Sequence, residues 1–463
     1  MSDALADIFN NFNPDLPATE EFYYDCSRAR GNGALTHEFQ RCLARAKTKL
    51  TFLFSGHLGC GKSSELRRLA AALEKAESPD ACCLPIFVDA SEYLDDFDVT
   101  PTDILLAIVT ELAATFRDKL NIELHASFFA RRLDELKKYL LSDVEINEGE
   151  IPLLGAKLKI QRLKKDPDAR DHVRKALEPR MATMLEEINA TIGEAREKMK
   201  QSSGRYQDVV FIVDNLEKIR RVPGTNEGEP SLRELFIARY AQLTGMEAHF
   251  IYTVPLRLIR SSDRNVLRNL YSQILVLPMV KVLDRSGQPN REGHASLRAL
   301  VEKRLGDSGA GGVGGVFEDD AFDLLVTYSG GVTRELMRFV QRASTYMDAL
   351  PITVDAAYRA IGETVETFST SIPEAHWRKL AALDLSPDRQ IDNADDDYMK
   401  MLENLSVLEY RDSETNPKAL SPTDRLAHSE PWYAVNPVVK ELQRFKSATE
   451  SMLDDRRKEI GLK

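Results

Sequence analysis

One short segment constrains the fold of this chain more than any other feature. Residues 56–63 read GHLGCGKS, which fits the spacing G-x-x-x-x-G-K-[ST] of a phosphate-binding loop. The apolar run 50–54 precedes it, and residues 62–74 follow it with leucines at helical spacing. A strand before the loop and a helix after it are the context in which this motif binds nucleotide phosphates. The chain is therefore expected to fold around a P-loop domain.

The residue types of this loop suit a triphosphate. Glycines let the backbone turn tightly enough to direct several N–H groups at phosphate oxygens, and the helix that starts near Lys62 adds the positive end of its dipole. Lys62 brings a positive charge to the β- and γ-phosphates, and Ser63 offers a hydroxyl to Mg²⁺. The nucleotide-binding residues expected here are Gly56, Gly59, Cys60, Gly61, Lys62, Ser63 and Ser64.

An acidic residue at the end of a second apolar run is expected to hold the metal. Residues 209–213 read VVFIV and are followed by Asp214, and α/β sheets bind ligands at the carboxyl ends of their strands. Ser63 and Asp214 are thus the predicted Mg²⁺ ligands, Asp214 through water. The attacking water also needs a group that orients or deprotonates it. Either Glu217 is this base, or hydrolysis is slow and Asn215 only positions the water.

Two residues farther along the chain complete the candidate catalytic set. Thr253 ends the apolar run 249–253, where its hydroxyl is in position to bond the γ-phosphate or the attacking water. Arg334 follows Gly330 and Gly331 at the start of a helix, from which a guanidinium can reach over a phosphate. The plainer alternatives are a β-branched residue that ends a strand and an ordinary surface arginine.

The order of apolar runs and helical segments predicts the fold class. Five candidate strands alternate with helices, at 50–54, 83–88, 209–213, 249–253 and 274–277. Such alternation is typical of an α/β fold with a parallel sheet covered on both faces. The highly charged segment 121–205 is expected to be a helical insertion between core strands, with a hairpin at 144–163.

The same pattern suggests four units. Residues 1–34 are expected to form an extended N-terminal arm, and residues 35–285 the P-loop core with its insertion. Residues 286–370 read as a helical lid. Residues 371–463 combine helices, two short strands and a last helix, which is the pattern of a winged helix.

Composition narrows the class of protein. The net charge is −11, and a dedicated nucleic-acid binder usually carries a basic domain. No window approaches the roughly 18 uninterrupted apolar residues of a membrane span, and the N-terminus has no basic start of a secretory signal. The five cysteines are an odd, sparse set that reads as free thiols in a reducing compartment. We therefore expect a cytoplasmic protein without a membrane partner.

Taken in order, these motifs resemble those of the AAA+-related ATPases, in particular the STAND (signal-transduction ATPase) and origin-recognition branch. The resemblance is carried by the loop 56–63, DNLEK at 214–218, YTVP at 252–255, SGGVTR at 329–334 and the closing winged helix. It implies ATP and Mg²⁺ as cofactors. It also implies that Thr253 matches the sensor-1 position, that Arg334 is the sensor-2 arginine, and that Tyr23 and Tyr24 border the adenine. The candidates for an arginine finger are Arg220, Arg221 and Arg257.

The resemblance implies a molecular switch that binds ATP and hydrolyses it slowly. Related proteins fuse an effector and sensing repeats to this core, whereas this sequence starts just before the core and stops after the winged helix. We therefore expect a stand-alone bacterial form that assembles as a homo-oligomer, or recruits a separately encoded effector, in anti-phage (antiviral) defence. The alternative is a DNA-binding, origin-recognition-like ATPase whose winged helix reads duplex through residues 396–411. Acidic residues on that segment count against phosphate contacts.

A third reading is a P-loop protein that has lost its activity and is purely structural. The intact Lys62, Ser63 and Asp214 argue against it. A small-molecule phosphotransferase is a fourth, and the predicted lid and terminal domain fit it poorly.

Overall fold

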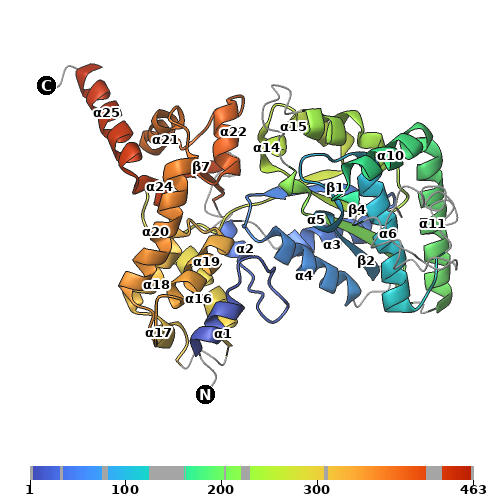
Figure 1. Ribbon diagram of the computed structural model, residues 1–463, viewed down its shortest axis with the longest axis horizontal. Coiled ribbons are helices and arrows are strands. Elements are labelled where there is room, and N and C mark those ends of the chain that lie inside the picture. The colour runs from blue at the N-terminus through green and yellow to red at the C-terminus, as the bar shows by residue number, and fades with distance from the viewer. Residues whose placement is uncertain are drawn as a thin grey trace.

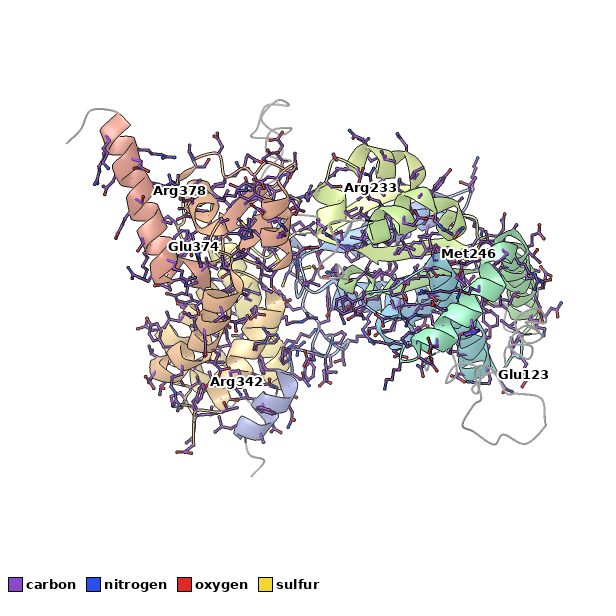
Figure 2. All side chains as sticks on the ribbon, turned by 45° about the horizontal axis from the view of Figure 1, so that its top comes forward. Glu123, Arg233, Met246, Arg342, Glu374 and Arg378 are labelled. Carbon is purple, nitrogen blue, oxygen red and sulfur yellow. The ribbon has the colours of Figure 1, made fainter. Side chains whose placement is uncertain are left out.

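The computed structural model describes residues 4–31, 35–75, 82–124, 161, 163–202, 205–219, 230–306, 311–412 and 430–459. The chain forms a lobe around a sheet and a second, mainly helical lobe (Figure 1). Figure 2 shows the same two lobes in another view, with Arg342, Glu374 and Arg378 on the helical lobe and Arg233, Met246 and Glu123 on the sheet lobe. The hairpin expected at 144–163 falls almost wholly outside the described residues.

A five-stranded parallel sheet is the centre of the first lobe. Its order is β2-β3-β4-β1-β5. The strands are β1 (Thr51–Gly56), β2 (Cys83–Asp89), β3 (Asp208–Asp214), β4 (His249–Val254) and β5 (Gln273–Leu277). Buried on both faces, they read as continuous apolar runs, as parallel strands do. The parallel α/β core and the helical lobe with its terminal two-stranded sheet confirm the predicted fold class, a P-loop NTPase of AAA+-like architecture.

Register brings the functional strand ends to one edge. Asp89 at the end of β2 lies beside Asp214 at the end of β3, and Thr253 of β4 lies beside Phe54 of β1. The P-loop leaves β1 directly after these positions. Because the carboxyl ends of parallel strands meet at one edge, side chains far apart in the sequence converge there.

Alternate residues of the strands pack into two apolar layers, one on each face of the sheet. Phe52 and Phe54 of β1 face the layer under α3 (Leu35–Arg45) and α4 (Lys62–Glu74). Leu53 faces the opposite layer, under α6 (Pro101–Leu120). This period of two is what a strand covered on both faces requires.

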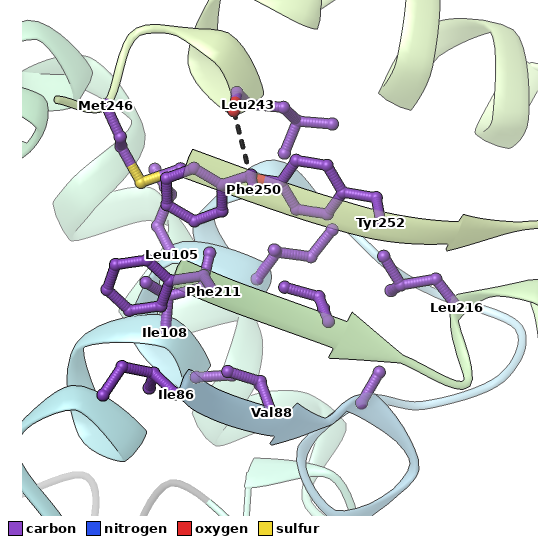
Figure 3. Close-up of a cluster of buried hydrophobic side chains, with 14 of the residues drawn as sticks. Ile86, Val88, Leu105, Ile108, Phe211, Leu216, Leu243, Met246, Phe250 and Tyr252 are labelled. Carbon is purple, nitrogen blue, oxygen red and sulfur yellow. Dashed lines mark hydrogen bonds between the residues drawn. The ribbon is translucent and has the colours of Figure 1, made fainter. Parts of the chain in front are cut away.

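Aromatic rings pack along the second layer (Figure 3). The ring of Phe250 stacks on Phe211 and on Tyr252, with centroid separations of 4.7 and 5.5 Å. The Tyr252 hydroxyl donates to the Leu243 carbonyl at 3.0 Å. Its polar end is thereby satisfied while the ring stays in the core.

The described part of segment 121–205 is helical and belongs to this core. It contains α10 (Pro167–Leu177), η2 (Glu178–Arg180) and α11 (Met181–Ser202). One face of α11 buries Met184, Ile188, Ile192, Ala195 and Met199 in the same layer as α6. Two arginines of α10 fix it to α6 and to the chain just before α6. Arg170 pairs with Asp98, and Arg174 pairs with Asp98 and with Asp103 of α6.

Short elements complete the sheet lobe. They are α5 (Ala90–Tyr93), η3 (Leu216–Lys218), α12 (Pro230–Arg233), η4 (Glu234–Ala238), α13 (Tyr240–Thr244), α14 (Leu256–Arg260) and α15 (Arg264–Leu270). No helix among the described residues of either lobe has the length and apolar content to cross a bilayer.

The helical lobe contains the elements expected of a lid and a winged helix. The first group is α16 (Arg291–Leu305), α17 (Val313–Val316), α18 (Asp319–Tyr328), α19 (Thr333–Ser344) and α20 (Val354–Ser371). The second is α21 (His376–Leu385), α22 (Asp396–Glu403), β6 (Val407–Tyr410), β7 (Trp432–Val435), α24 (Pro437–Lys440) and α25 (Gln443–Glu459). β6 and β7 pair antiparallel. A single apolar cluster contains residues of both groups, so they share one core.

The N-terminal segment differs from the extended arm that was expected. Residues 4–11 form α1 (Ala4–Asn11) and residues 27–30 form α2 (Ser27–Arg30). Ile8 and Phe12 are buried in the core of the helical lobe, next to α19 and α16. A helix of two turns has too short a pattern to be recognised in the sequence, and its stability comes from this packing.

Candidate functional site

A cleft of about 350 Å³ lies at the carboxyl edge of the sheet. The P-loop, the strand ends, the N-terminal segment and the lid helices all contribute to its walls. The predicted site residues that line it are Tyr24, Gly59, Gly61, Lys62, Ser63, Ser64, Asp214, Asn215, Glu217 and Arg334. Gly56, Cys60 and Thr253 are not part of the wall, and Cys60 and Thr253 are fully buried behind it. The fold thus brings most of the predicted set into one cleft.

The shape of the loop depends on its glycines. Gly59 has a φ of +75°, and a Cβ there would lie 2.8 Å from the Cβ of Arg334. At Gly56, with φ of +155°, a Cβ would lie 2.7 Å from the carbonyl oxygen of Leu277. The chain therefore passes between β5 and the lid at distances that only glycine permits. α4 starts at Lys62, so its first N–H groups and the positive end of its dipole lie at the cleft.

Lys62 is held against the loop and against a carboxylate. Its ammonium donates to the carbonyls of Gly56 and His57, at 3.1 and 3.0 Å, and pairs with Glu217 Oε1 at 3.1 Å. Burial acts to lower the pKa of Lys62, but the charges of Glu217 and Asp214 outweigh it and raise that pKa. The lysine is a fixed positive charge at the cleft floor.

The two carboxyl groups of the site have opposite pKa shifts. Burial and the charge of Glu217 raise the pKa of Asp214 to about 6, although the Ser63 hydroxyl and the Asn215 N–H bond it. Burial also acts to raise the pKa of Glu217, but Lys62 and the Thr253 hydroxyl lower it on balance. Glu217 therefore carries the anion more readily than Asp214 does. Environments that separate two carboxyl groups in this way are typical of acid–base sites.

The donor set fits a divalent cation. Ser63 and Asp214 already touch through a hydrogen bond, so a hydroxyl and a carboxylate oxygen converge on one spot. Mg²⁺ prefers oxygen ligands and keeps several waters. Glu217 Oε2 is buried and has no protein partner, which leaves an acceptor for a water molecule. This combination suits Mg²⁺ bound with a nucleotide and water.

Thr253 acts on the turn after β3. Its Oγ1 accepts from the Leu216 N–H at 3.0 Å and donates to the Val213 carbonyl at 3.4 Å. Asn215 has a left-handed φ of +68°, and its amide donates to Asp89 Oδ1 at 2.7 Å. Thr253 and Asp89 thus shape the turn that presents Asp214 and Glu217. Asp89 was missed in the sequence, where the signal was an acid at the end of an apolar run.

The lid contacts the P-loop directly. The Arg334 N–H and the Thr333 hydroxyl both donate to the Gly59 carbonyl, at 3.0 and 2.9 Å. Arg334 also lines the cleft. The first turn of α19 therefore closes one side of the site.

The N-terminal segment covers the other side. Tyr24 lines the cleft and is 36% exposed, whereas the Tyr23 hydroxyl donates to Glu65 at 2.8 Å. Ser64 Oγ accepts from the Ala18 N–H at 3.0 Å, so this hydroxyl binds the segment. Both tyrosines line the cleft, and the Arg68 guanidinium lies 4.8 Å from the centroid of the Tyr23 ring.

Arg30, Glu65 and Arg304 are among the charged residues of the cleft that were not expected from the sequence. Arg30 donates to the Cys60 and Pro278 carbonyls at 2.7 and 2.5 Å and fixes the loop from behind. Glu65 has one buried oxygen without a hydrogen-bond partner. Arg304 has a buried Nε without a partner, and burial lowers its pKa to about 10. Tertiary folding alone brings these residues together, since no local pattern marks them.

One candidate for an arginine finger is excluded. Arg257 is 5% exposed and pairs with Glu403 at 2.8 Å, so it is committed within its own chain. Arg220 and Arg221 lie outside the described residues.

The segment proposed to read DNA packs partly on the sheet lobe. Residues 396–411 comprise α22 and β6, and α22 contacts α14. The acids of its first turn are paired with lysines, Asp397 with Lys379 and Asp396 with Lys400. This surface therefore offers few free cations for phosphate contacts.

Comparisons with known proteins give no close relative. No protein-family model matches the sequence, and no curated protein does. Solved structures do show similarity, and the following three match over most of their length. Aeropyrum pernix ORC1 in complex with DNA is 12% identical, with a TM-score of 0.36 over 92% of this chain and 93% of that one. Aeropyrum pernix ORC2 in its ADPNP–ADP complexes is 13% identical (TM-score 0.37, 91% and 93%), and Cdc6p from Pyrobaculum aerophilum is 10% identical (0.38, 96% and 98%).

Proposed function

We propose that this protein is an ATP-binding switch that hydrolyses ATP slowly. One observation carries the proposal: the P-loop carbonyl of Gly59 is bonded by Thr333 and Arg334 of the lid. The same cleft contains Lys62, Asp214 and Glu217. A ligand on the loop therefore meets the sheet lobe and the lid together, which is what a switch driven by nucleotide needs.

Each residue has a role in this proposal. The loop N–H groups and Lys62 bind the β- and γ-phosphates, and Arg334 contacts the γ-phosphate from the lid. Ser63 and Asp214 hold Mg²⁺, which neutralises charge on the phosphates when bound. Glu217 accepts the proton of the attacking water, and Thr253 fixes the turn that carries Glu217. Tyr24 borders the adenine at the cleft mouth.

The surroundings of Glu217 support slow hydrolysis for as long as Lys62 stays paired with this carboxylate. Lys62 pairs with it, and the pKa of Glu217 is lowered. A carboxylate with a lowered pKa is a weaker base, since proton transfer works best near the operating pH. Asn215 adds no second acid beside Asp214.

The wider role is inferred from the resemblance to STAND ATPases. ATP binding would close the lid and promote assembly of a homo-oligomer or docking of a separately encoded effector, and hydrolysis would reset the switch. Anti-phage defence is the setting proposed for this ATPase.

Nucleotide titration and light scattering test this proposal. We expect the wild-type chain to bind ATP and ADP with Mg²⁺, and Lys62→Ala to lose that binding. We expect an increase in mass with ATP and not with ADP, which Lys62→Ala lacks. Tight binding by Lys62→Ala would refute the P-loop assignment. DNA binding that falls steeply with salt, without ATP-dependent assembly, would favour the DNA-reading alternative.

A further inference from the structure

A side chain of the P-loop itself is bonded to the C-terminal unit. His57 is the second residue of the loop, and its ring lies between two backbone groups of residues 396–410. Its Nδ1 lies 3.1 Å from the Leu402 carbonyl oxygen, at the end of α22. Its Nε2 accepts from the N–H of Glu409 on β6 at 2.8 Å. Both ring nitrogens are thus used between lobes, some 350 residues apart in sequence.

These two contacts define the state of the ring. A carbonyl oxygen only accepts, so Nδ1 must carry the proton, and Nε2 must be the neutral acceptor for the Glu409 N–H. His57 is 2% exposed, and burial lowers its pKa to about 4 despite the opposing charge of Glu409, with Lys62 and Arg260 adding to the decrease. The ring is therefore neutral and fully bonded at neutral pH.

Glu409, which His57 contacts on β6, is also held in place. Arg260 of α14 binds both carboxylate oxygens of Glu409, and both side chains are buried. The Met279 N–H donates to the Glu409 carbonyl at 3.4 Å. β6 is therefore fixed to the sheet lobe at the residue that His57 contacts.

The backbone of His57 touches the phosphate machinery. Its carbonyl accepts from the Lys62 ammonium at 3.0 Å. A shift of the loop backbone at His57 would thus move a group that positions Lys62. Buried hydrogen bonds resist such a shift, because leaving the Leu402 carbonyl and the Glu409 N–H unsatisfied costs free energy.

We propose that His57 is a positioning residue through which the winged helix sets the conformation of the P-loop. When α22 and β6 are docked, His57 holds the loop in the form seen here. When they move away, the loop loses this support, and the His57 carbonyl that accepts from Lys62 is no longer held from the side of the winged helix. The lid contacts the loop at Gly59, so two parts of the helical lobe hold the loop at two different residues.

Coupling of this kind acts in both directions. If docking of α22 and β6 changes nucleotide affinity, nucleotide binding must change docking by the same factor. The inference thus deepens the proposed function, on which its nucleotide readout rests. The inference can also be tested without nucleotide, because hydrogen–deuterium exchange of the loop and β6 amides depends on the His57 contact and not on a ligand.

The test compares three variants in the full chain. His57→Ala removes both bonds, and His57→Gln keeps an acceptor at about the position of Nε2. Glu403→Gln is the matched control, since it breaks the ion pair to Arg257 between the same lobes and leaves the loop untouched. The first measurement is hydrogen–deuterium exchange of residues 57–61 and 407–410 without nucleotide. The second is the dissociation rate of a fluorescent ADP analogue with Mg²⁺.

His57→Ala is expected to raise exchange in both segments and to speed ADP dissociation at least about tenfold. His57→Gln is expected to restore part of each, and Glu403→Gln to leave dissociation within about twofold of wild type. If His57→Ala raises exchange in residues 407–410 alone and leaves the rate of ADP dissociation unchanged, the inference is wrong. The contact of His57 would then contribute only to packing. If the wild type binds no nucleotide, the proposed function fails, and parallel changes in the two exchange rates still decide the inference.

Discussion

The ammonium of Lys62 lies 3.1 Å from Oε1 of Glu217, and both side chains are nearly inaccessible to solvent. Lys62, the proposed phosphate-binding residue, therefore neutralises the charge of Glu217, the proposed base for the attacking water. A phosphate that draws Lys62 toward itself would weaken this pair and free the carboxylate. In the proposed function, the pair would thus couple nucleotide binding to the basicity of Glu217.

Glu217→Gln tests the role of the carboxylate. The amide keeps the size of the side chain but cannot accept a proton, so we expect ATP hydrolysis to fall by about 10²–10⁴-fold while ATP binding persists. Steady-state phosphate release and nucleotide titration measure the two quantities. Unchanged turnover would move the role of base to another group, with Asn215 as the residue that positions water.

Arg334→Ala tests whether the lid detects the γ-phosphate. A hydrogen bond to a charged group contributes roughly 1.5–3 kcal/mol, so ATP affinity should fall about tenfold or more, and ADP affinity should change much less. Arg338→Ala is the matched control, because Arg338 lies one turn further along α19, pairs with Glu335 and does not line the cleft. Calorimetric titration with both nucleotides gives the answer. Equal losses for ATP and ADP would show that Arg334 does not distinguish them.

Gly59→Ala tests the close approach of the loop to the lid. The new Cβ would sit 2.8 Å from Arg334 Cβ, in a backbone conformation with φ of +75°. Gly287→Ala provides the control, since Gly287 has a φ of +82° and nothing within 4 Å of its Cβ position. The left-handed conformation alone costs about 1–2 kcal/mol. Thermal unfolding should therefore show a larger loss of stability for Gly59→Ala than for Gly287→Ala. Nucleotide affinity should fall only in Gly59→Ala. Equal losses of stability in the two variants would mean that the lid shifts to admit the new Cβ at no cost in free energy.

The buried state of His57 predicts a dependence of stability on pH. Its pKa falls from 6.5 to about 4 on folding, so the unfolded chain takes up a proton near pH 6 that the folded chain does not. This contribution is fully present above pH 6.5 and is lost as pH falls toward 4. Between pH 7 and 5 it removes roughly 2 kcal/mol. Denaturant unfolding of wild type and His57→Gln should give curves that converge as the pH is lowered; parallel curves would contradict the burial of a neutral ring.

The P-loop and the sheet were predictable because their signals are local. The spacing of 56–63 is set by the chemistry of phosphate binding, and the strands of a sheet covered on both faces read as apolar runs. Asp214 was predicted to belong to the site because it ends an apolar strand, and it lines the cleft. The helix 62–74 was predicted with the bounds that α4 has.

The remaining parts of the site depend on tertiary contacts. Arg30, Glu65 and Arg304 come from three segments whose local sequence does not indicate a cleft. His57 occupies a position of the motif where any residue is allowed, so its bonds to Leu402 and Glu409 could not be inferred. α1 is too short to show a periodicity of its own. Such features arise only when distant segments pack.

The core shared by the lid and the terminal helices has a mechanical consequence. One apolar cluster joins α19, whose first turn contacts the loop, to α21 and α24, and α21 packs in turn along α25. α25 has 17 residues and extends from the far end of this lobe (Figure 1), a length of about 25 Å at 1.5 Å per residue. A rigid body turns through one angle everywhere, so displacement grows with distance from the pivot. A rotation that shifts Arg334 slightly at Gly59 would sweep the tip of α25 through a much longer arc, and the lobe would act as a lever with its short arm at the phosphates.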